Sequence, residues 1–567
     1  MKYILLLLLI STFSVTPSSA QLMEKKEKFT EADTLRGSLN PRRTWWNVQR
    51  YDILVQPDIA KRTITGQNRI SFSITSPSAE MQIDLQQPMQ IDSIVWNYAG
   101  GKTLPFSRRN NIALVVFPSI PPEVKESSIT IFFSGKPTIA IRPPWDGGWI
   151  WTRDENGNPW ISVACQGLGA SVWYPCKDHQ SDEPDQGATL TMIVPEALTG
   201  VANGRLIKEE KIPSGLKLYT WEVKNPINNY NLIPYIGKYA NFTDTLQGEK
   251  GKLDLSYWVL ENHVEEAKKQ FIQAKSMLRA FEYWMGPYPF YEDGYKLVEA
   301  PHLGMEHQSA IAYGNKFLNG YLGMDLSRSG WGLKWDYIII HESGHEWFAN
   351  NITSNDIADM WIHEGYTTYT ETLYTDYFYG KQAGNEYNYG LREGIENQTP
   401  IVGSYGVNKE GSGDMYPKTA NMIHSIRHAM NNDSLFRSYL RTLNKELYHA
   451  QVDYADIEKI TTRFTGWSVA AIFQQYLTTT QIPRFAYSLS PDGKTLYYRW
   501  ENCTENFDLP VWIGLASPEG KQVQLLPKGN QWKKWSSENI IGINSIKEIE
   551  KMYYCTLQQQ AFTGELK

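Results

Sequence analysis

The residues with the clearest chemical meaning in this chain are two histidines four positions apart, His341 and His345, with Glu342 directly after the first. Residues four apart share one face of an α-helix, so both imidazoles can reach a single metal ion. Zinc binds neutral imidazole nitrogen at about 2.0–2.1 Å. Glu342 then lies beside the ion, where a carboxylate can take a proton from a metal-activated water. The intervening Ser343 and Gly344 are weak helix formers, so function accounts for this stretch better than helix propensity does.

A third metal ligand is predicted at Glu364, which follows His345 by nineteen positions and lies in the segment Trp361-Ile362-His363-Glu364-Gly365. A second helix, expected over residues 356–377, can carry this carboxylate to the same ion. Two histidines and one glutamate leave a fourth position for water, which is typical of catalytic rather than structural zinc.

Two neighbours of Glu364 need separate consideration. Glu371 lies two turns further along the same helix face, so it is either a hydrogen-bond partner of a ligand histidine or a solvated surface glutamate. His363 points about 100° away from Glu364 on a helix, and we do not expect it to bind the ion.

At these residues the sequence resembles the aminopeptidase N family of zinc exopeptidases, gluzincins related to leukotriene hydrolase. The family pattern is His-Glu-x-x-His, then eighteen residues, then Glu within Trp-x-x-Glu-Gly, and this chain matches every named position. Tyr51-Asp52-Ile53 and residues 62–66 also resemble the first β domain of the family. The resemblance implies a thermolysin-like catalytic domain, one zinc ion per chain, and hydrolysis of the N-terminal residue from peptides by zinc-activated water.

The segment Gly304-Met305-Glu306 resembles the Gly-x-Met-Glu-Asn exopeptidase motif of the family. The resemblance implies that Glu306 binds the free α-amino group of the substrate, and that Gly304 and Met305 lie along the bound peptide. A carboxylate that holds an ammonium fixes how far the peptide enters the site. Leu303 and His307 replace the usual Gly and Asn, which leaves the neighbouring contacts and the side-chain preference open.

Two further positions are carried over from the same family. Tyr416, in Tyr416-Pro417-Lys418-Thr419, resembles the Tyr-x-Lys-Gly tyrosine that stabilises the oxyanion of the tetrahedral intermediate, although Thr419 replaces the glycine. Gln166 lies ten positions before Cys176 and resembles a family residue that helps to bind the substrate amine. A purely structural turn is an equal alternative for Gln166.

The periodicity of the chain predicts a multidomain α+β fold. Alternating apolar residues, as at Leu190, Met192 and Val194, are typical of antiparallel strands with one wet face. After Asn262 the apolar spacing becomes three and four, which predicts a helix that ends at Gly286-Pro287. A turn at Asp492-Gly493 opens a second β segment. The expected organisation is a signal peptide at 1–20, a leader arm at 21–45, an N-terminal antiparallel β domain at 46–248, a thermolysin-like zinc catalytic domain at 249–480 and a small C-terminal β domain at 481–567.

The first residues carry a targeting signal. Lys2 precedes an apolar stretch that is too short to span a bilayer, and Ser18-Ser19-Ala20 provides small residues before a cleavage site. We therefore expect export to the periplasm or the medium and no stable membrane anchor. The net charge of −6 becomes −7 once residues 1–20 are removed, because Lys2 is the only charged residue among them. Mild acidity argues against nucleic acid as a partner.

Four cysteines fit an oxidising compartment, either as the pairs Cys165–Cys176 and Cys503–Cys555 or as free buried thiols. The chain ends after the second β segment, so we expect it to lack the large C-terminal helical domain of many family members.

The expected substrates are peptides with a free N-terminus. The alternatives are a zinc endopeptidase, epoxide hydrolysis on the same scaffold, or a non-catalytic peptide-binding protein. A binding protein of this kind usually lacks a ligand or the base, and here none is missing. The sequence leaves open the preferred first residue, the natural substrate and the oligomeric state.

Overall fold

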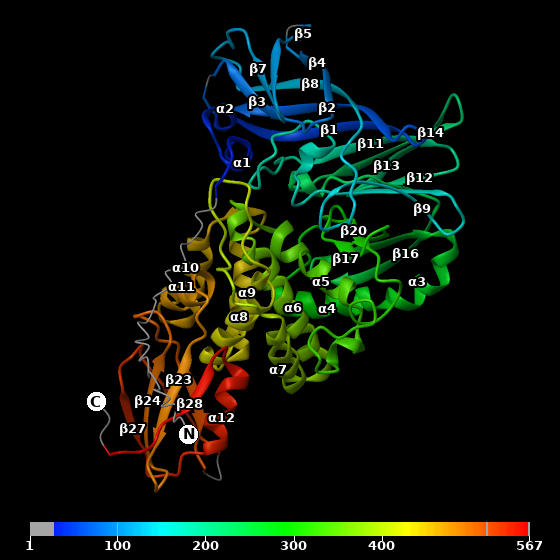
Figure 1. Ribbon diagram of the computed structural model, residues 1–567. Helices are drawn as coiled ribbons and strands as arrows, with labels where there is room; N and C mark the ends of the chain where they lie inside the picture. The colour runs from blue at the N-terminus through cyan, green and yellow to red at the C-terminus, as the bar shows by residue number, and fades with distance from the viewer. Residues whose placement is uncertain (1–27, 77, 99, 517–519, 565–567) are drawn as a thin grey trace, which may run out of the picture.

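The computed structural model describes residues 28–76, 78–98, 100–516 and 520–564 (Figure 1). The predicted signal peptide and residues 21–27 of the predicted leader arm lie outside the described residues. The rest of the arm forms two short helices, α1 (Glu31–Gly37) and α2 (Pro41–Thr44). Helix α1 begins at Thr30, whose side chain and that of Asp33 cap the first turn reciprocally.

A large twisted sheet forms most of the N-terminal part, at the top of Figure 1. The predicted alternation is confirmed, because Leu190, Met192 and Val194 are all buried. Every pairing in this sheet is antiparallel except the one between β1 and β11, which is parallel. The strands, in spatial order, are β13 (Arg205–Ile212), β14 (Leu216–Val223), β11 (Ala188–Pro195), β1 (Trp46–Asp58), β2 (Thr63–Ile74), β8 (Glu126–Gly135), β4 (Gln90–Trp96) and β5 (Lys102–Thr103).

Two smaller sheets complete this part of the chain. The first has three strands, in the order β3 (Glu80–Asp84), β7 (Ile112–Val116) and β6 (Phe106–Arg109). The second has four strands, in the order β12 (Thr199–Val201), β15 (Tyr235–Gly237), β10 (Pro159–Ala164) and β9 (Gly148–Arg153).

The central part combines a five-stranded sheet with helices, as Figure 1 shows in green to orange. The strands, in spatial order, are β16 (Tyr239–Gly248), β17 (Gly251–Leu260), β18 (Tyr295–Glu299), β20 (Ile311–Tyr313) and β19 (Gly304–Met305). The helices are α3 (Val264–Gln270), α4 (Ile272–Met285), α5 (Tyr337–Gly344), α6 (Trp361–Tyr379), α7 (Lys381–Gly390), α8 (Pro417–Met430), α9 (Asp433–Glu446), α10 (Tyr454–Thr465) and α11 (Ala470–Thr478). A parallel pair, β21 (Ile352–Ser354) and β22 (Ala450–Val452), lies among them.

Two predicted helices differ from the observed ones. The helix expected after Asn262 is divided into α3 and α4 at Phe271, although its apolar stripe is buried from Ala267 to Met285 and half-buried at Val264. The helix expected over residues 356–377 begins later, at Trp361. Asp356 instead caps a short 3-10 turn, Ile357–Asp359, which leads into α6.

The C-terminal part is a β segment with one helix, α12 (Ile543–Met552). It contains two sheets. The first has four strands, in the order β27 (Lys533–Ser536), β24 (Thr495–Glu501), β23 (Arg484–Leu489) and β28 (Thr556–Gln559). The second is the pair β25 (Val511–Gly514) and β26 (Gln522–Leu525). Its apolar residues, such as Trp500 and Phe507, join the hydrophobic core of the helical part through Tyr476 of α11.

The described residues form two hydrophobic cores, one in the N-terminal sheets and one in the helical and C-terminal parts. Met305 of β19 belongs to the N-terminal core, whereas its neighbour Leu303 packs against the other. Strand β19 is the last strand of its sheet, so one of its edges has no strand beside it in the described part of the chain. This edge therefore lies where the two cores meet.

All four cysteines are free thiols, and Cys165, Cys176 and Cys555 are buried. Of the alternatives that the sequence left open, the structure has free thiols and not the pairs Cys165–Cys176 and Cys503–Cys555. None of the helices in the described ranges is long and apolar enough to cross a membrane.

Candidate active site

Helix α5 positions the two histidines and the glutamate between them. It begins at Asp336, whose carboxylate accepts hydrogen bonds from the backbone N–H groups of Ile338 (3.1 Å) and Ile339 (3.3 Å). His341 and Glu342 lie within the helix, and His345 is the residue at its end. The structure also explains why a glycine stands at position 344. A Cβ atom there would lie 2.6 Å from the Thr370 hydroxyl of α6, so glycine lets the two helices come close.

The three predicted metal ligands converge on one point. The Nε2 atoms of His341 and His345 lie 3.7 and 3.3 Å from Oε2 of Glu364. Ligands held about 2.0–2.1 Å from a tetrahedral zinc ion lie roughly 3.3 Å apart, so these spacings suit zinc. The Glu364 Oε2 atom is buried and has no hydrogen-bond partner among the residues that the structure describes. A buried carboxylate oxygen is rarely left unpaired, and a bound cation satisfies it.

The other ring nitrogens of the two histidines are already bonded. Nδ1 of His341 donates to Glu371 (2.6 Å), and Nδ1 of His345 donates to the carbonyl oxygen of Phe348 (3.0 Å). Because these partners accept, each Nδ1 carries the hydrogen and each Nε2 keeps a lone pair for a metal. Of the two interpretations of Glu371, the hydrogen-bond partner is therefore the one observed. His363 does not take part, since its Nε2 accepts from the backbone N–H of Ser354 (2.8 Å).

Glu342 and Tyr416 line the same cavity, which has a volume of about 1130 Å³. Burial raises the pKa of Glu342 to about 7, against the lowering effect of the neighbouring histidines. A Cβ atom at Gly304 would lie 2.7 Å from Oε1 of Glu342, so glycine in β19 lets this carboxylate rest against the strand. Tyr416 lies directly before α8, with its ring centroid 6.0 Å from that of His341. The cavity thus has a carboxylate and a phenol close to the predicted metal ligands.

The cavity also receives Gln166 from the N-terminal part of the chain and Glu306 from the central part. Oε1 of the buried Glu306 accepts hydrogen bonds from Gln166 Nε2 (2.6 Å) and from the Tyr230 hydroxyl (2.9 Å). The carbonyl oxygen of Glu306 accepts from the Asn350 side chain (2.8 Å), which fixes the backbone at this point. Carboxylate and nitrogen atoms of Glu306, Glu342 and His345 lie within 4.8 Å of one another. Sequence reasoning missed Tyr230, which lies in the turn Asn229–Asn231 and belongs to no motif that we recognised.

The replacements around the Gly-Met-Glu segment have local explanations. His307 is buried, and its Nδ1 lies 2.5 Å from the Tyr235 hydroxyl, which itself donates to the Ala310 carbonyl. Leu303 packs against the hydrophobic core of the helical part. The hydrogen bonds to the Glu306 carboxylate come from Gln166 and Tyr230, and not from the side chains of Leu303 or His307.

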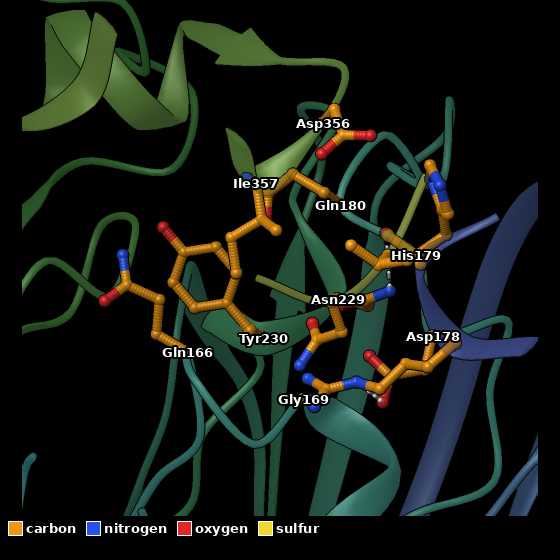
Figure 2. A pocket seen from close by; sticks show the side chains of 13 residues that line it. Gln166, Gly169, Asp178, His179, Gln180, Asn229, Tyr230, Asp356 and Ile357 are labelled. Atoms are coloured by element: carbon orange, nitrogen blue, oxygen red, sulfur yellow. Dashed lines mark hydrogen bonds and ion pairs between the residues drawn. The ribbon is translucent and has the colours of Figure 1, made fainter. Parts of the chain in front are cut away.

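A second, smaller cavity of about 400 Å³ lies behind this end of the active-site cavity. Gln166 and Tyr230 lie together on one side of it, and His179 and Asp178 lie across from them (Figure 2). Gln166 lines both cavities, so it forms part of the wall between them.

Comparison with known families gives two matches. Residues 47–230 match the model of the peptidase M1 N-terminal domain, and residues 271–476 match the model of the peptidase family M1 domain. Together these matches cover well over half of the chain. The M1 family consists of zinc metallopeptidases, which agrees with the donor set described above.

Among curated proteins, the chain is 20% identical over 424 residues to endoplasmic reticulum aminopeptidase 1 of Rattus norvegicus, covering 70% of this chain and 44% of the relative. It is 22% identical over 304 residues to leukotriene A-4 hydrolase of Xenopus laevis, covering 50% of this chain and 46% of the relative. The chain thus spans less than half the length of these curated relatives.

Among solved structures, a mutant form of an M1 zinc metallopeptidase from Deinococcus radiodurans, bound to a Tyr-Ser-Ala substrate, has the same fold. The TM-score is 0.62 at 19% identity, and the match covers 77% of this chain and 95% of that chain.

Proposed function

Because this chain belongs to peptidase family M1, we propose that it is a zinc-dependent aminopeptidase, which hydrolyses the N-terminal residue from peptides. The observation that carries the proposal is the position of Glu306. Its buried carboxylate, held by Gln166 and Tyr230, lies beside His345 and Glu342. A substrate ammonium bound there places the first peptide bond of the chain, and no later one, next to the metal ligands.

We propose one zinc ion per chain, held by His341, His345 and Glu364. When bound, zinc supplies a Lewis acid that acidifies water and polarises the scissile carbonyl. Glu342 removes a proton from the attacking water and passes it to the leaving amine. The Tyr416 phenol donates a hydrogen bond to the oxygen that becomes negative in the transition state.

The peptide backbone would lie along the free edge of β19. Strand β19, formed by Gly304 and Met305, pairs with β20 on one side, and an extended peptide can add to its other side as a further strand. Main-chain hydrogen bonds of this kind give affinity without selecting a side chain, so the preference for the first residue must come from the cavity walls.

We further propose that the protein is exported and that the signal peptide, residues 1–20, is removed. The support is the order of the charged, apolar and small residues at the start of the sequence. The free thiols neither support nor oppose this proposal, because free buried cysteines occur in every compartment.

Hydrolysis of single-residue reporter amides tests the activity directly. Each amide is offered with a free and with an acetylated N-terminus, before and after chelation and zinc replacement. Cleavage of free amines alone, lost with the chelator and restored by zinc, is expected. Cleavage of acetylated substrates would indicate an endopeptidase, and no cleavage of any substrate would indicate a binding protein.

Replacement of the base separates catalysis from metal binding. Glu342→Gln should lower kcat by about 10²–10⁴-fold, the usual contribution of general acid–base catalysis, because the amide cannot accept the proton. Metal analysis should still find one zinc ion per chain, since Glu342 is not one of the three ligands. A zinc-loaded variant with near wild-type turnover would exclude Glu342 as the base.

A further inference from the structure

A fourth carboxylate, that of Glu410, lines the active-site cavity and has no part in the proposed reaction. It lies in the connecting segment 401–412, between the 3-10 turn Leu391–Gly394 and the turn Gly413–Met415 that precedes Tyr416. Desolvation and, after it, the negative charge of Glu364 raise the pKa of Glu410. The side chain lines the same cavity as the predicted metal ligands, although the residue as a whole is exposed to solvent.

The residues just before Glu410 show where its segment runs. Val407 and Asn408 of the same segment line the smaller cavity, together with Gln166 and Tyr230. These last two residues are the hydrogen-bond donors to Glu306, and they are visible on one side of that cavity in Figure 2. The segment thus runs beside the wall at the Glu306 end, and Glu410, two residues after Asn408, lines the active-site cavity.

The segment is anchored at several points, so Glu410 is not carried on a loose loop. The N–H of Gly406 donates to Asp356 (2.8 Å), and the Tyr405 hydroxyl donates to Asp359 (2.9 Å). Both carboxylates belong to the turn that leads into α6, the helix of Glu364. Directly after Glu410, a Cβ atom at Gly411 would lie 1.5 Å from the Ile401 carbonyl oxygen, so only glycine permits this path.

The described residues that line the cavity provide no counterion for Glu410. Four glutamates are among them, and no lysine or arginine is. In the proposed reaction Glu364 binds zinc, Glu306 binds the α-amino group, and Glu342 transfers the proton. The positive charge of Lys409, next in the chain, lowers the pKa of Glu410, but desolvation and Glu364 outweigh it. A cationic group that enters the cavity therefore meets a carboxylate that the reaction does not use.

We propose that Glu410 selects peptides whose first residue has a basic side chain, arginine or lysine. This inference rests on the proposed aminopeptidase function and adds a substrate class to it. The guanidinium or ammonium group reaches Glu410 while the α-amino group of the same residue is bound by Glu306. A hydrogen bond between ionised groups at a partly desolvated site is stronger than one at the open surface.

The test compares two reporter amides that differ in charge and hardly in shape, those of arginine and citrulline. The wild-type enzyme should have a kcat/KM ratio for arginine over citrulline of about tenfold or more. Glu410→Gln should reduce this ratio to near one, and Glu410→Lys should bring it below one. Glu265→Gln, on α3, removes a surface carboxylate outside the cavity and should leave the ratio as in the wild type.

The outcomes separate this inference from the proposed function. If no free-amine reporter is cleaved, the proposed function fails. If citrulline and alanine amides are cleaved but arginine is not preferred, or if Glu410→Gln leaves the ratio unchanged, the aminopeptidase stands and the role of Glu410 is wrong. Thermal unfolding of each variant shows that a changed ratio does not come from a misfolded protein.

Discussion

At the scale of single residues, the metal site depends on groups that do not touch the ion. Glu371 accepts hydrogen bonds from Nδ1 of His341 (2.6 Å) and from the Tyr387 hydroxyl (2.5 Å). These two bonds fix the imidazole orientation and hold its lone pair toward Glu364. The spacing of Glu371 made it a candidate in the sequence, but only the side-chain geometry separates this partner from a surface glutamate. Tyr230 could not have been predicted at all, because it reaches Glu306 from a distant turn.

Glu371→Gln should weaken zinc binding by about 10–100-fold, because an amide is a poorer partner for the ligand histidine than a carboxylate. Competition with a chelator of known affinity measures the zinc dissociation constant of each variant. Tyr387→Phe removes only the outer hydrogen bond and should have a smaller effect. An unchanged dissociation constant for Glu371→Gln would mean that this carboxylate does not position His341.

At the scale of elements, helices α6 and α8 bring Glu364 and Tyr416 together through a close contact. The side chain of Thr419 lies over Gly365, where a Cβ atom would meet its Cγ2 at 2.2 Å. The glycine that directly follows Glu364 therefore accommodates the threonine that replaces a glycine at position 419. In the sequence Thr419 was simply a departure from the expected motif. Its packing could not be read from either segment alone, since the two residues lie 54 positions apart.

Gly365→Ala should destabilise the protein by about 1–3 kcal/mol, as overpacking of a core usually does. Helix propensity alone predicts the opposite, because alanine stabilises a helix interior by about 1 kcal/mol relative to glycine. The double variant Gly365→Ala/Thr419→Gly removes the clash and should recover most of the loss. Urea unfolding of the wild type, both single variants and the double variant gives the coupling energy, and additive effects would contradict the contact.

Some of these helices and strands could be predicted from the sequence, and others could not. Period-two and helical patterns arise from burial on one face, so the strand with Leu190 and the apolar stripe through Phe271 were both recognisable. The break at Phe271 and the late start of α6 at Trp361 depend on local capping and on tertiary packing. The periodicity of apolar residues contains no information about either. The parallel pairing of β1 with β11 joins segments more than a hundred residues apart, and no local pattern specifies it.

At the scale of the whole molecule, the active site lies where the two hydrophobic cores meet, and buried polar groups connect the parts on either side. Lys296 of β18 donates to the carbonyl oxygens of Ala202 (3.1 Å), Gly204 (2.7 Å) and Ser309 (3.0 Å). Three acceptors match the three hydrogens of an ammonium group, so this lysine links the N-terminal sheets to the catalytic sheet. Because Gln166 and Glu306 come from opposite sides of the boundary, their contact depends on such links.

Glu183 makes a second link across the boundary. The Thr353 hydroxyl of β21 lies 2.5 Å from both Glu183 Oε1 and the Ala349 carbonyl oxygen. The other oxygen, Oε2, accepts from Gln451 Nε2 (2.6 Å). Burial raises the pKa of Glu183 to about 7.

This raised pKa sets the sign of a pH effect on stability. Between pH ~4.5 and ~7 the unfolded chain loses the Glu183 proton while the folded protein keeps it. The stabilisation is therefore complete below pH ~4.5 and is lost as the pH rises through about 7, by an amount on the order of 3 kcal/mol. Glu183→Gln stays neutral, so its free energy of unfolding relative to the wild type should rise between pH ~5 and ~8. Urea unfolding over this range measures the difference, with Glu209→Gln on β13 as a control on an exposed carboxylate. A difference that is constant with pH would show that Glu183 is ionised in the folded protein, and the link across the boundary would then be a charged one.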